Sequence, residues 1–312
     1  MRFEELNSLG KQRKPFLFIS DFLAQNIKII ELDELPHVDV EFSIDENYRC
    51  KKHGEVFVKH PQSFEKYNKQ FDEVLEQIKS GNTYLLNLTC KTPIETSLSL
   101  KEIYELSNAH YKLRYKDEFV SFSPEKFVQI KDNKIHTYPM KGTIDSSIKD
   151  ATYKILHDEK EMAEHVMVVD LLRNDLSIVA SHVRVEDFRY VKSIDSGEKT
   201  LLHVSSHISG NLEDNWHEKI GDILKALLPA GSISGTPKKS TVEIIQKVED
   251  YDRGFFSGVF GVYDGVSLDS GVMIRFVDNT KDGLVYKSGG GITLDSDVKL
   301  EYNELLDKIY LP

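Results

Sequence analysis

The two residues best suited to chemistry in this sequence are Glu125 and Lys141, a carboxylate and an amine sixteen positions apart. Apolar and polar residues alternate on both sides of 131–133, which predicts a hairpin with strands at 126–130 and 134–138. In that register the chain beyond the second strand brings Lys141 back near Glu125. Such a pair is either a surface ion pair or, in a sheltered site, a carboxyl group beside an amine that loses its proton readily.

Four further carboxylates come as two pairs with helical spacing. Glu161 and Glu164 are three residues apart, and so are Glu301 and Glu304, each pair within a segment expected to be helical. Carboxylates so placed usually form a solvated helix face. If the two faces meet, however, their repulsion requires a cation, and an all-oxygen site suits Mg²⁺. The sequence has no Cys or His cluster of the kind that binds zinc.

Candidates for anion binding are two glycine-rich segments and one arginine. Gly289-Gly290-Gly291 follows an expected strand at 284–287, and 231–238 precedes an expected helix whose amino end attracts anions. Either segment could instead be an ordinary tight turn, and neither has the spacing of a P-loop. Arg275 lies in an apolar run and either points outward or meets an anion inside the protein.

Two histidines, His203 and His207, flank a short segment that is expected to be a strand. A single histidine in such a position is more often structural than catalytic.

The elements that must position these residues mix helices and strands without a βαβ rhythm, which favours an α+β fold with largely antiparallel sheets. A second hairpin is expected at 254–263 and 272–277, with its turn at Asp264-Gly265. Residues 1–60 have strand and loop character. Helices are expected at 61–80, 158–176, 216–228, 236–248 and 296–309, with Thr236 as an N-cap and Pro237 at the first helical position.

Composition limits the class of protein. The 312 residues carry a formal net charge of -11, which argues against nucleic acid or an anionic membrane as the main partner. Cys50 and Cys90 give neither a disulfide framework nor a metal-ligand spacing, and free thiols in a reducing cytosol are expected. No signal peptide or membrane-spanning segment is evident, so a cytoplasmic protein is expected.

Taken in order, these segments resemble the chorismate-utilising enzymes, which include anthranilate, aminodeoxychorismate, isochorismate and salicylate synthases. The resemblance runs from about residue 63 to 312 and is expected to form the catalytic core, with 1–62 as a shortened N-terminal segment joined to it. The motifs that carry it are Ser123-Pro124-Glu125, Pro139-Met140-Lys141-Gly142-Thr143, Glu161-Met162-Ala163-Glu164-His165, Val169-Asp170-Leu171-Leu172-Arg173-Asn174-Asp175-Leu176, the segment 231–238, Arg253-Gly254-Phe255-Phe256-Ser257-Gly258, Ile274-Arg275, Gly289-Gly290-Gly291-Ile292, Asp295-Ser296-Asp297 and Glu301-Tyr302-Asn303-Glu304.

This resemblance implies two antiparallel sheets packed as a sandwich with helices outside, and a role for each candidate residue. Chorismate would be the substrate and Mg²⁺ the cofactor, bound directly by Glu164 and Glu304 and supported by Glu161 and Glu301. Glu125 would be the general acid or base. The substrate would be bound by Arg275, Gly289, Gly290, Gly291, Thr143 and His203.

Lys141 separates branches of the family, because the resemblance implies a lysine here in aminodeoxychorismate synthases and an alanine in anthranilate synthases. The lysine branch aminates chorismate at C4, with the amine acting as a covalent nucleophile at C2. Leu85 stands where isochorismate and salicylate synthases carry a basic lysine, which disfavours those activities, and Phe256 replaces a common tyrosine.

The expected product is 4-amino-4-deoxychorismate, a precursor of p-aminobenzoate and folate. No glutaminase signature is present, so ammonia would come from solution or from a separate glutamine amidotransferase subunit. Two alternatives remain open: an anthranilate synthase large subunit, and a non-catalytic binding subunit of the same family.

Overall fold

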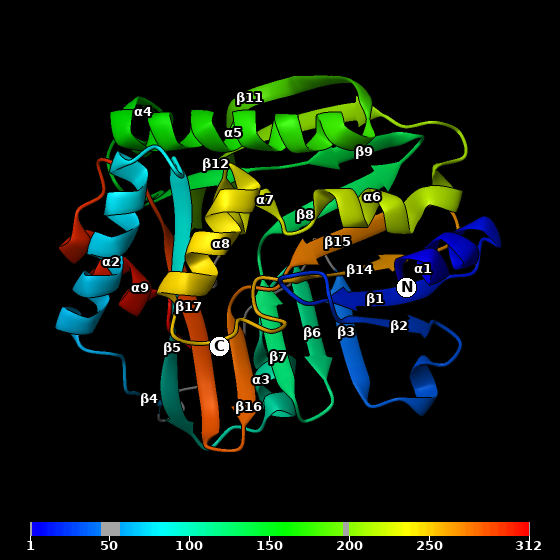
Figure 1. The fold of residues 1–312 in the computed structure, drawn as a ribbon, viewed down its shortest axis with the longest axis horizontal. Helices are drawn as coiled ribbons and strands as arrows, with labels where there is room; N and C mark the ends of the chain where they lie inside the picture. The colour runs from blue at the N-terminus through cyan, green and yellow to red at the C-terminus, as the bar shows by residue number, and fades with distance from the viewer. Residues whose placement is uncertain (1, 45–56, 196–199, 312) are drawn as a thin grey trace.

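The computed structural model describes residues 2–44, 57–195 and 200–311. Within them, two antiparallel sheets form a sandwich with helices outside, as Figure 1 shows, and the expected α+β class is confirmed. The nine-stranded sheet runs β10 (Met140–Asp145), β12 (Thr200–Asn211), β9 (Lys134–Thr137), β8 (Lys126–Lys131), β15 (Leu268–Val272), β14 (Val259–Tyr263), β1 (Phe16–Ser20) and β2 (Ile27–Glu31), and β11 (Ser181–Asp195) pairs with β12. The eight-stranded sheet runs β13 (Gly235–Thr236), β5 (Leu85–Thr96), β17 (Gly283–Ile292), β16 (Phe276–Thr280), β7 (Phe119–Ser123), β6 (Tyr111–Tyr115) and β3 (Val40–Ile44), and β4 (Phe57–Lys59) pairs with β5.

Alternation along β1 shows how the layers are built. Leu17 and Ile19 pack in a cluster with Phe260, Leu113 and Phe119, and this cluster joins the two sheets. Phe16 and Phe18 face the other way, into the larger core that the helices cover. Because successive strand residues point to opposite faces, a strand buried on both faces is apolar on both, as β1 is from Phe16 to Ile19.

Three helices each begin after a residue whose side chain caps the first turn. α2 (Phe64–Lys79) begins after Ser63, whose side chain accepts a hydrogen bond from the Lys66 amide. α5 (Glu159–Val179) begins after Asp158, and α9 (Val298–Asp307) begins after Asp297, each capped in the same manner. The remaining helical elements are α1 (Arg2–Lys11), η1 (Leu35–His37), α3 (Leu100–Leu106), α4 (Ala151–His157), η2 (Trp216–Lys219), α6 (Ile220–Leu227), α7 (Gly231–Ser234) and α8 (Lys238–Val248).

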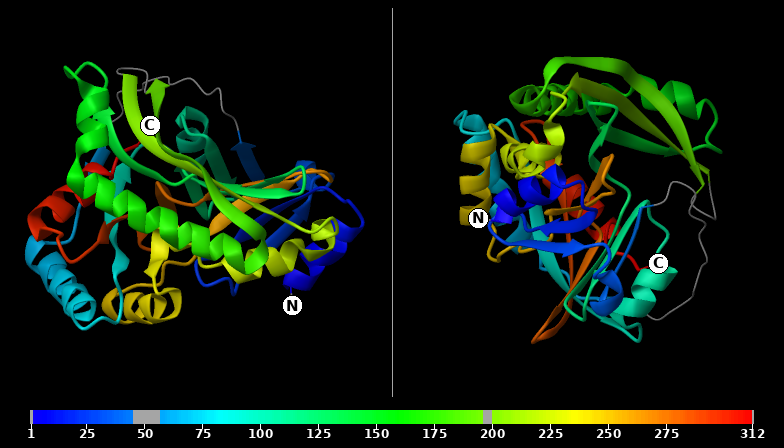
Figure 2. Two further views of the ribbon diagram at one scale, coloured as in Figure 1. Left: turned by 90° about the horizontal axis from the view of Figure 1, so that it is seen from above. Right: turned by 90° about the vertical axis from the view of Figure 1, so that its right-hand side faces the viewer.

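The long helix α5 lies along β11 and β12 and also packs on α6 and α7, as Figure 2 shows from two further directions. α2 contacts both α8 and α9, and α9 packs on β17. The C-terminal helix is therefore next to the strand that carries the glycine run.

Several local predictions were wrong. The N-terminal region begins with the helix α1 rather than with strand and loop, and α1 packs on α6. The return strand of the second hairpin is β15, Leu268–Val272, because the chain bends at 273–275 and enters the other sheet as β16. Pro237, and not Thr236, is the N-cap of α8, and the Thr236–Pro237 peptide is cis.

The glycine run is also not a loop. Gly289, Gly290 and Gly291 lie within β17 and pair with Thr89, Leu88 and Asn87 of β5. β16 pairs with β17 only as far as Lys287, so among the described strands the opposite edge of the run has no partner.

Cys90 is a buried free thiol, whereas Cys50 lies outside the described residues. No helix in the described part of the chain is long and apolar enough to cross a membrane. The boundary expected near residue 63 stays a prediction, although β1 and β2 belong to the same sheet as the C-terminal strands β14 and β15.

Candidate active site

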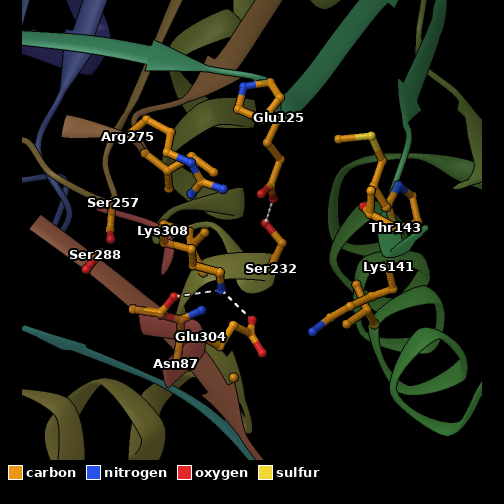
Figure 3. A pocket seen from close by; sticks show the side chains of 18 of the residues that line it. Asn87, Glu125, Lys141, Thr143, Ser232, Ser257, Arg275, Ser288, Glu304 and Lys308 are labelled. Atoms are coloured by element: carbon orange, nitrogen blue, oxygen red, sulfur yellow. Dashed lines mark hydrogen bonds and ion pairs between the residues drawn. The ribbon is translucent and has the colours of Figure 1, made fainter. Parts of the chain in front are cut away.

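A cavity of about 470 Å³ opens where the ends of the two sheets meet α7 and α9. Figure 3 shows its polar side chains converging from several elements. Of the expected site residues, its lining includes Glu125, Lys141, Thr143, His203, Arg275, Gly289, Gly291 and Glu304, and it also includes Asn87, Ser232, Phe256, Ser257, Lys287, Ser288 and Lys308.

A β-bulge presents Lys141 to this cavity. In the pairing of β10 with β12, Met140 lies opposite Ser205 and Thr143 opposite His203, so β10 contains one extra residue between them. Gly142 within the bulge has φ +84°, a conformation that favours glycine. A bulge re-aims a side chain that a regular strand would place on a fixed face, which accounts for the direction of Lys141.

Lys141 is paired with a carboxylate on α5. Its Nζ lies 2.8 Å from Glu164 Oε2, and the Lys141 side chain remains 30% exposed. Burial pulls the pKa of Lys141 down, but Glu164, with smaller contributions from Glu161 and Glu304, outweighs burial and places the pKa above its ordinary value. Shelter alone was expected to release the proton of this amine, and the neighbouring carboxylates reverse that direction.

Glu125 lies across the cavity from Lys141 and is held by a serine. The Ser232 hydroxyl of α7 donates a 2.6 Å hydrogen bond to Glu125 Oε1 (Figure 3). Burial raises the pKa of Glu125, although Ser232 and the positive charges of Lys141, Arg275 and Lys308 act against this rise. A carboxyl group whose pKa is raised in a cavity is suited to proton transfer near neutral pH.

The carboxylate faces of α5 and α9 do meet, as the helical spacing suggested they might. Lys160 Nζ lies 3.9 Å from Glu164 Oε1 and 3.7 Å from Glu301 Oε1, which bridges the two helices. Lys308 Nζ lies 2.7 Å from Glu304 Oε1. Together with Lys141, three ammonium groups thus lie against the carboxylate quartet, which consists of Glu161, Glu164, Glu301 and Glu304.

The quartet offers the donor chemistry that Mg²⁺ requires. Burial and then Glu164 raise the pKa of Glu161, while burial raises that of Glu301 with Glu304 and Glu164 adding to the effect. Carboxylates close enough to repel one another favour a cation between them. Within the described residues no three His, Cys, Asp or Glu side chains group as a metal site. Mg²⁺ nevertheless needs only one or two protein carboxylates when substrate and water complete its shell, so the residues fit it.

Arg275 and Lys308 bring positive charge to the cavity lining. Arg275 lies at the bend between β15 and β16 with φ +53°, not inside a strand as expected, and its Nε donates to the Tyr310 hydroxyl over 3.2 Å. Lys308 Nζ donates to the Gly289 carbonyl over 2.9 Å. Lys308 lies one helical turn beyond Glu304, and that spacing is the signal by which the sequence could have revealed it.

The glycine run allows the chain to pass close to these groups. A Cβ at Gly290 would lie 3.4 Å from Glu301 Oε2, and one at Gly291 would lie 3.2 Å from a Leu85 methyl and 3.9 Å from Lys141 Nζ. Leu85 is buried, so an apolar side chain adjoins the run beside the amine.

The two histidines have different surroundings. His203 is buried and lines the cavity, and its Nδ1 has no hydrogen-bond partner within the described residues. Burial, with Lys192, lowers the pKa of His203, which favours the neutral ring. His207 instead lies 3.0 Å from His136 and stacks on Tyr138, away from the cavity lining.

Comparison with known proteins agrees with this geometry. The family described as chorismate binding enzyme matches residues 28–311. An uncharacterised PabA-like protein of Haemophilus influenzae is 47% identical over 313 residues, which cover 99% of this chain and 95% of the relative. The chain belongs to the chorismate-binding enzyme family. Within that family, the aminodeoxychorismate synthase component 1 of Salmonella typhimurium is 31% identical over 258 residues, which cover 78% of this chain and 56% of the relative.

Other members of the chorismate-binding family carry different names. The anthranilate synthase component 1 of Archaeoglobus fulgidus is 32% identical over 258 residues, covering 79% of this chain and 61% of that relative. A Bacillus anthracis structure described as a 2,3-dihydroxybenzoate-specific isochorismate synthase has a TM-score of 0.71 at 21% identity, covering 98% of this chain and 87% of the other. That structure supports the sandwich fold of the family and not a particular reaction.

Proposed function

We propose that this protein aminates chorismate at C4 and so acts as the chorismate-binding component of an aminodeoxychorismate synthase. The proposal rests on one observation above all: Lys141 and Glu125 line the same cavity as Arg275 and Lys308. A nucleophile, a proton donor and two cationic groups therefore surround a space of about 470 Å³. The resemblance to relatives named aminodeoxychorismate synthase component 1 gives independent support.

In the proposed reaction, the neutral amine of Lys141 forms a bond to C2 of chorismate while the C4–O bond breaks. Glu125 gives a proton to the departing hydroxyl, which leaves as water. Ammonia then bonds to C4 as the C2–N bond breaks, and the lysine is released. Arg275 and Lys308 bind carboxylate groups of the substrate through charge-assisted hydrogen bonds.

The electrostatics of the site determine when Lys141 can react. As an ammonium paired with Glu164, Lys141 has no lone pair to donate. It becomes nucleophilic only after it loses a proton to solvent, and a second cation bound to Glu164 would make that loss easier. Glu164 and Glu304 would hold Mg²⁺, with Glu161 and Glu301 in support. Bound there, the metal would supply electrostatic stabilisation of a substrate carboxylate.

Ammonia is proposed to come from a separate glutamine amidotransferase subunit or from solution. Purified protein incubated with chorismate, Mg²⁺ and an ammonium salt is expected to form 4-amino-4-deoxychorismate, identified by chromatography and mass. Fluorescent anthranilate as the sole product would overturn the proposal in favour of the anthranilate synthase reaction, an alternative that the Archaeoglobus relative keeps open. Absence of any turnover would instead favour a non-catalytic binding subunit.

A further inference from the structure

The carboxylate of Glu125 has a single hydrogen-bond partner within the described residues. The hydrogen bond runs from Ser232 Oγ to Oε1, and no lysine or arginine of that part of the chain forms an ion pair with the carboxylate. The cations that face it from other elements are Lys141 of β10, Arg275 at the bend and Lys308 after α9. The second carboxylate oxygen, Oε2, accepts no hydrogen bond from any described residue.

The helix that carries Ser232 is fastened on both sides of this residue. Gly231 lies so close to α5 that a Cβ there would come within 2.6 Å of Asp175 Oδ2. Lys238 lies 3.0 Å from Asp175 Oδ1 and donates to the Leu227 carbonyl. On the other side, Arg253 donates to the Ile233 carbonyl over 3.0 Å. These contacts fix the backbone while the Ser232 hydroxyl faces the cavity.

The neighbouring serine of α7 behaves differently. Ser234 is fully buried and donates to the Ala230 carbonyl four residues earlier, a common local contact of serine in helices. Ser232 instead bonds to a carboxylate 107 positions away in the sequence. The hydroxyl of Ser232 is therefore directed at Glu125 rather than at its own helix.

From this geometry we infer that Ser232 is the positioning residue of the acid–base group: its hydroxyl holds Oε1 of Glu125 and leaves Oε2 to carry the transferred proton. This inference rests on the proposed function for the role of Glu125. When Oε2 releases its proton to the leaving hydroxyl, the carboxylate that forms keeps the hydrogen bond from Ser232. A donor already in place stabilises that anion without rearrangement.

Removing the Ser232 hydroxyl should change the pKa of Glu125 in one direction. A hydrogen bond to a carboxylate favours its charged form, so Ser232→Ala should raise the pKa of Glu125 further. For a group that acts as an acid, the decline of kcat/KM at high pH then moves to higher pH. Turnover at the optimum should fall about tenfold to a hundredfold, the usual effect of losing a hydrogen bond to a charged group.

The test combines pH-rate profiles with infrared titration of the Glu125 carboxyl band, assigned by subtracting the spectrum of Glu125→Gln. Ser232→Ala should move the midpoint of the Glu125 titration to higher pH. Ser232→Thr, which keeps a hydroxyl, should bring the midpoint most of the way back to the wild-type pH, and Ser234→Ala should leave the midpoint unchanged. Thermal unfolding of the variants reports any general damage to α7.

An identical Glu125 titration in wild type and Ser232→Ala would overturn the inference whatever the product of the enzyme is. Absence of aminodeoxychorismate together with a shifted titration would sink the proposed function and leave the positioning role intact. Because the spectroscopic readout needs no substrate, the two failures are distinguishable.

Discussion

At the scale of single residues, two carboxyl groups of the cavity, Glu125 and Glu304, have pKa values shifted in opposite directions by their different neighbours. Glu125 faces positive groups at a distance and keeps a raised pKa because burial dominates. Glu304 is also subject to burial, but its direct contact with Lys308 outweighs burial and holds its pKa below the ordinary value. One carboxyl group is thus suited to carry a proton and the other to remain an anion.

Glu125→Gln tests the acid role. Glutamine can still accept the Ser232 hydrogen bond but cannot release a proton, so kcat should fall by about a hundredfold to ten-thousandfold with little change in KM. Steady-state kinetics with chorismate and ammonium ion would measure both constants. Glu118→Gln, an exposed carboxylate paired with Lys116, is the matched control. Near-normal kcat in Glu125→Gln would exclude Glu125 as the proton donor.

At the scale of elements, the bulge in β10 controls where Lys141 points. Gly142 combines φ +84° with close neighbours, because a Cβ there would lie 3.4 Å from Glu161 Oε2 and 3.5 Å from Ile155. Gly142 of β10 therefore lies close to Ile155 of α4 and to Glu161 of α5.

Gly142→Ala should therefore lower both stability and turnover. A left-handed conformation costs an L-residue about 1–2 kcal/mol, and displacement of the bulge should misplace the amine. Gly81→Ala is the control, since Gly81 has φ +75° with no atom within 4 Å of the position that a Cβ would take and is not among the residues that line the cavity. Chemical denaturation and kcat would be compared. Equal activity losses in the two variants would show that the bulge has no specific role.

The sequence predicted most of these elements because their signals are local. Ser63, Asp158 and Asp297 are caps that mark helix starts within a few residues. The hairpin of β8 and β9 was also predicted, since its turn and alternation are contiguous in the chain.

Contacts between segments far apart in the chain could not be predicted from the sequence, because no local pattern encodes them. The bend at Arg275 sends a continuous apolar run into two different sheets, and the pairing of Gly289 with Thr89 places a glycine run in a strand. The hydrogen bond from Ser232 to Glu125 spans 107 positions, and the sequence of 231–238 indicates only backbone amides at the start of a helix. The pairing of Lys141 with Glu164 depends on how α5 packs against β10.

At the scale of the whole molecule, a buried ion pair joins the helical layer to the eight-stranded sheet. Glu249 accepts hydrogen bonds from the Thr89 amide and hydroxyl and from Arg253, while Arg253 also donates to the Asn87 and Ile233 carbonyls. The side chains of Arg253 and Glu249 are 2% and 1% exposed. This network connects β5 to α7 through Asn87 and Ile233, two residues that line the cavity.

Arg253→Met should lower the free energy of unfolding by about 3–5 kcal/mol, because it leaves Glu249 buried without its partner charge. Lys66→Met removes an ion pair with Asp250 whose side chains are 49% and 45% exposed, and it should cost less than about 1 kcal/mol. Urea denaturation of both variants measures the difference. Similar losses would contradict the central role assigned to the buried network.

The account depends most on Lys141, and its replacement by alanine is the most direct test. Wild type and Lys141→Ala would be incubated with chorismate, Mg²⁺ and increasing ammonium, and 4-amino-4-deoxychorismate would be quantified by chromatography and mass. The covalent role predicts that the variant forms far less product than wild type, with at most partial recovery at high ammonium. Undiminished formation of 4-amino-4-deoxychorismate by Lys141→Ala would contradict it.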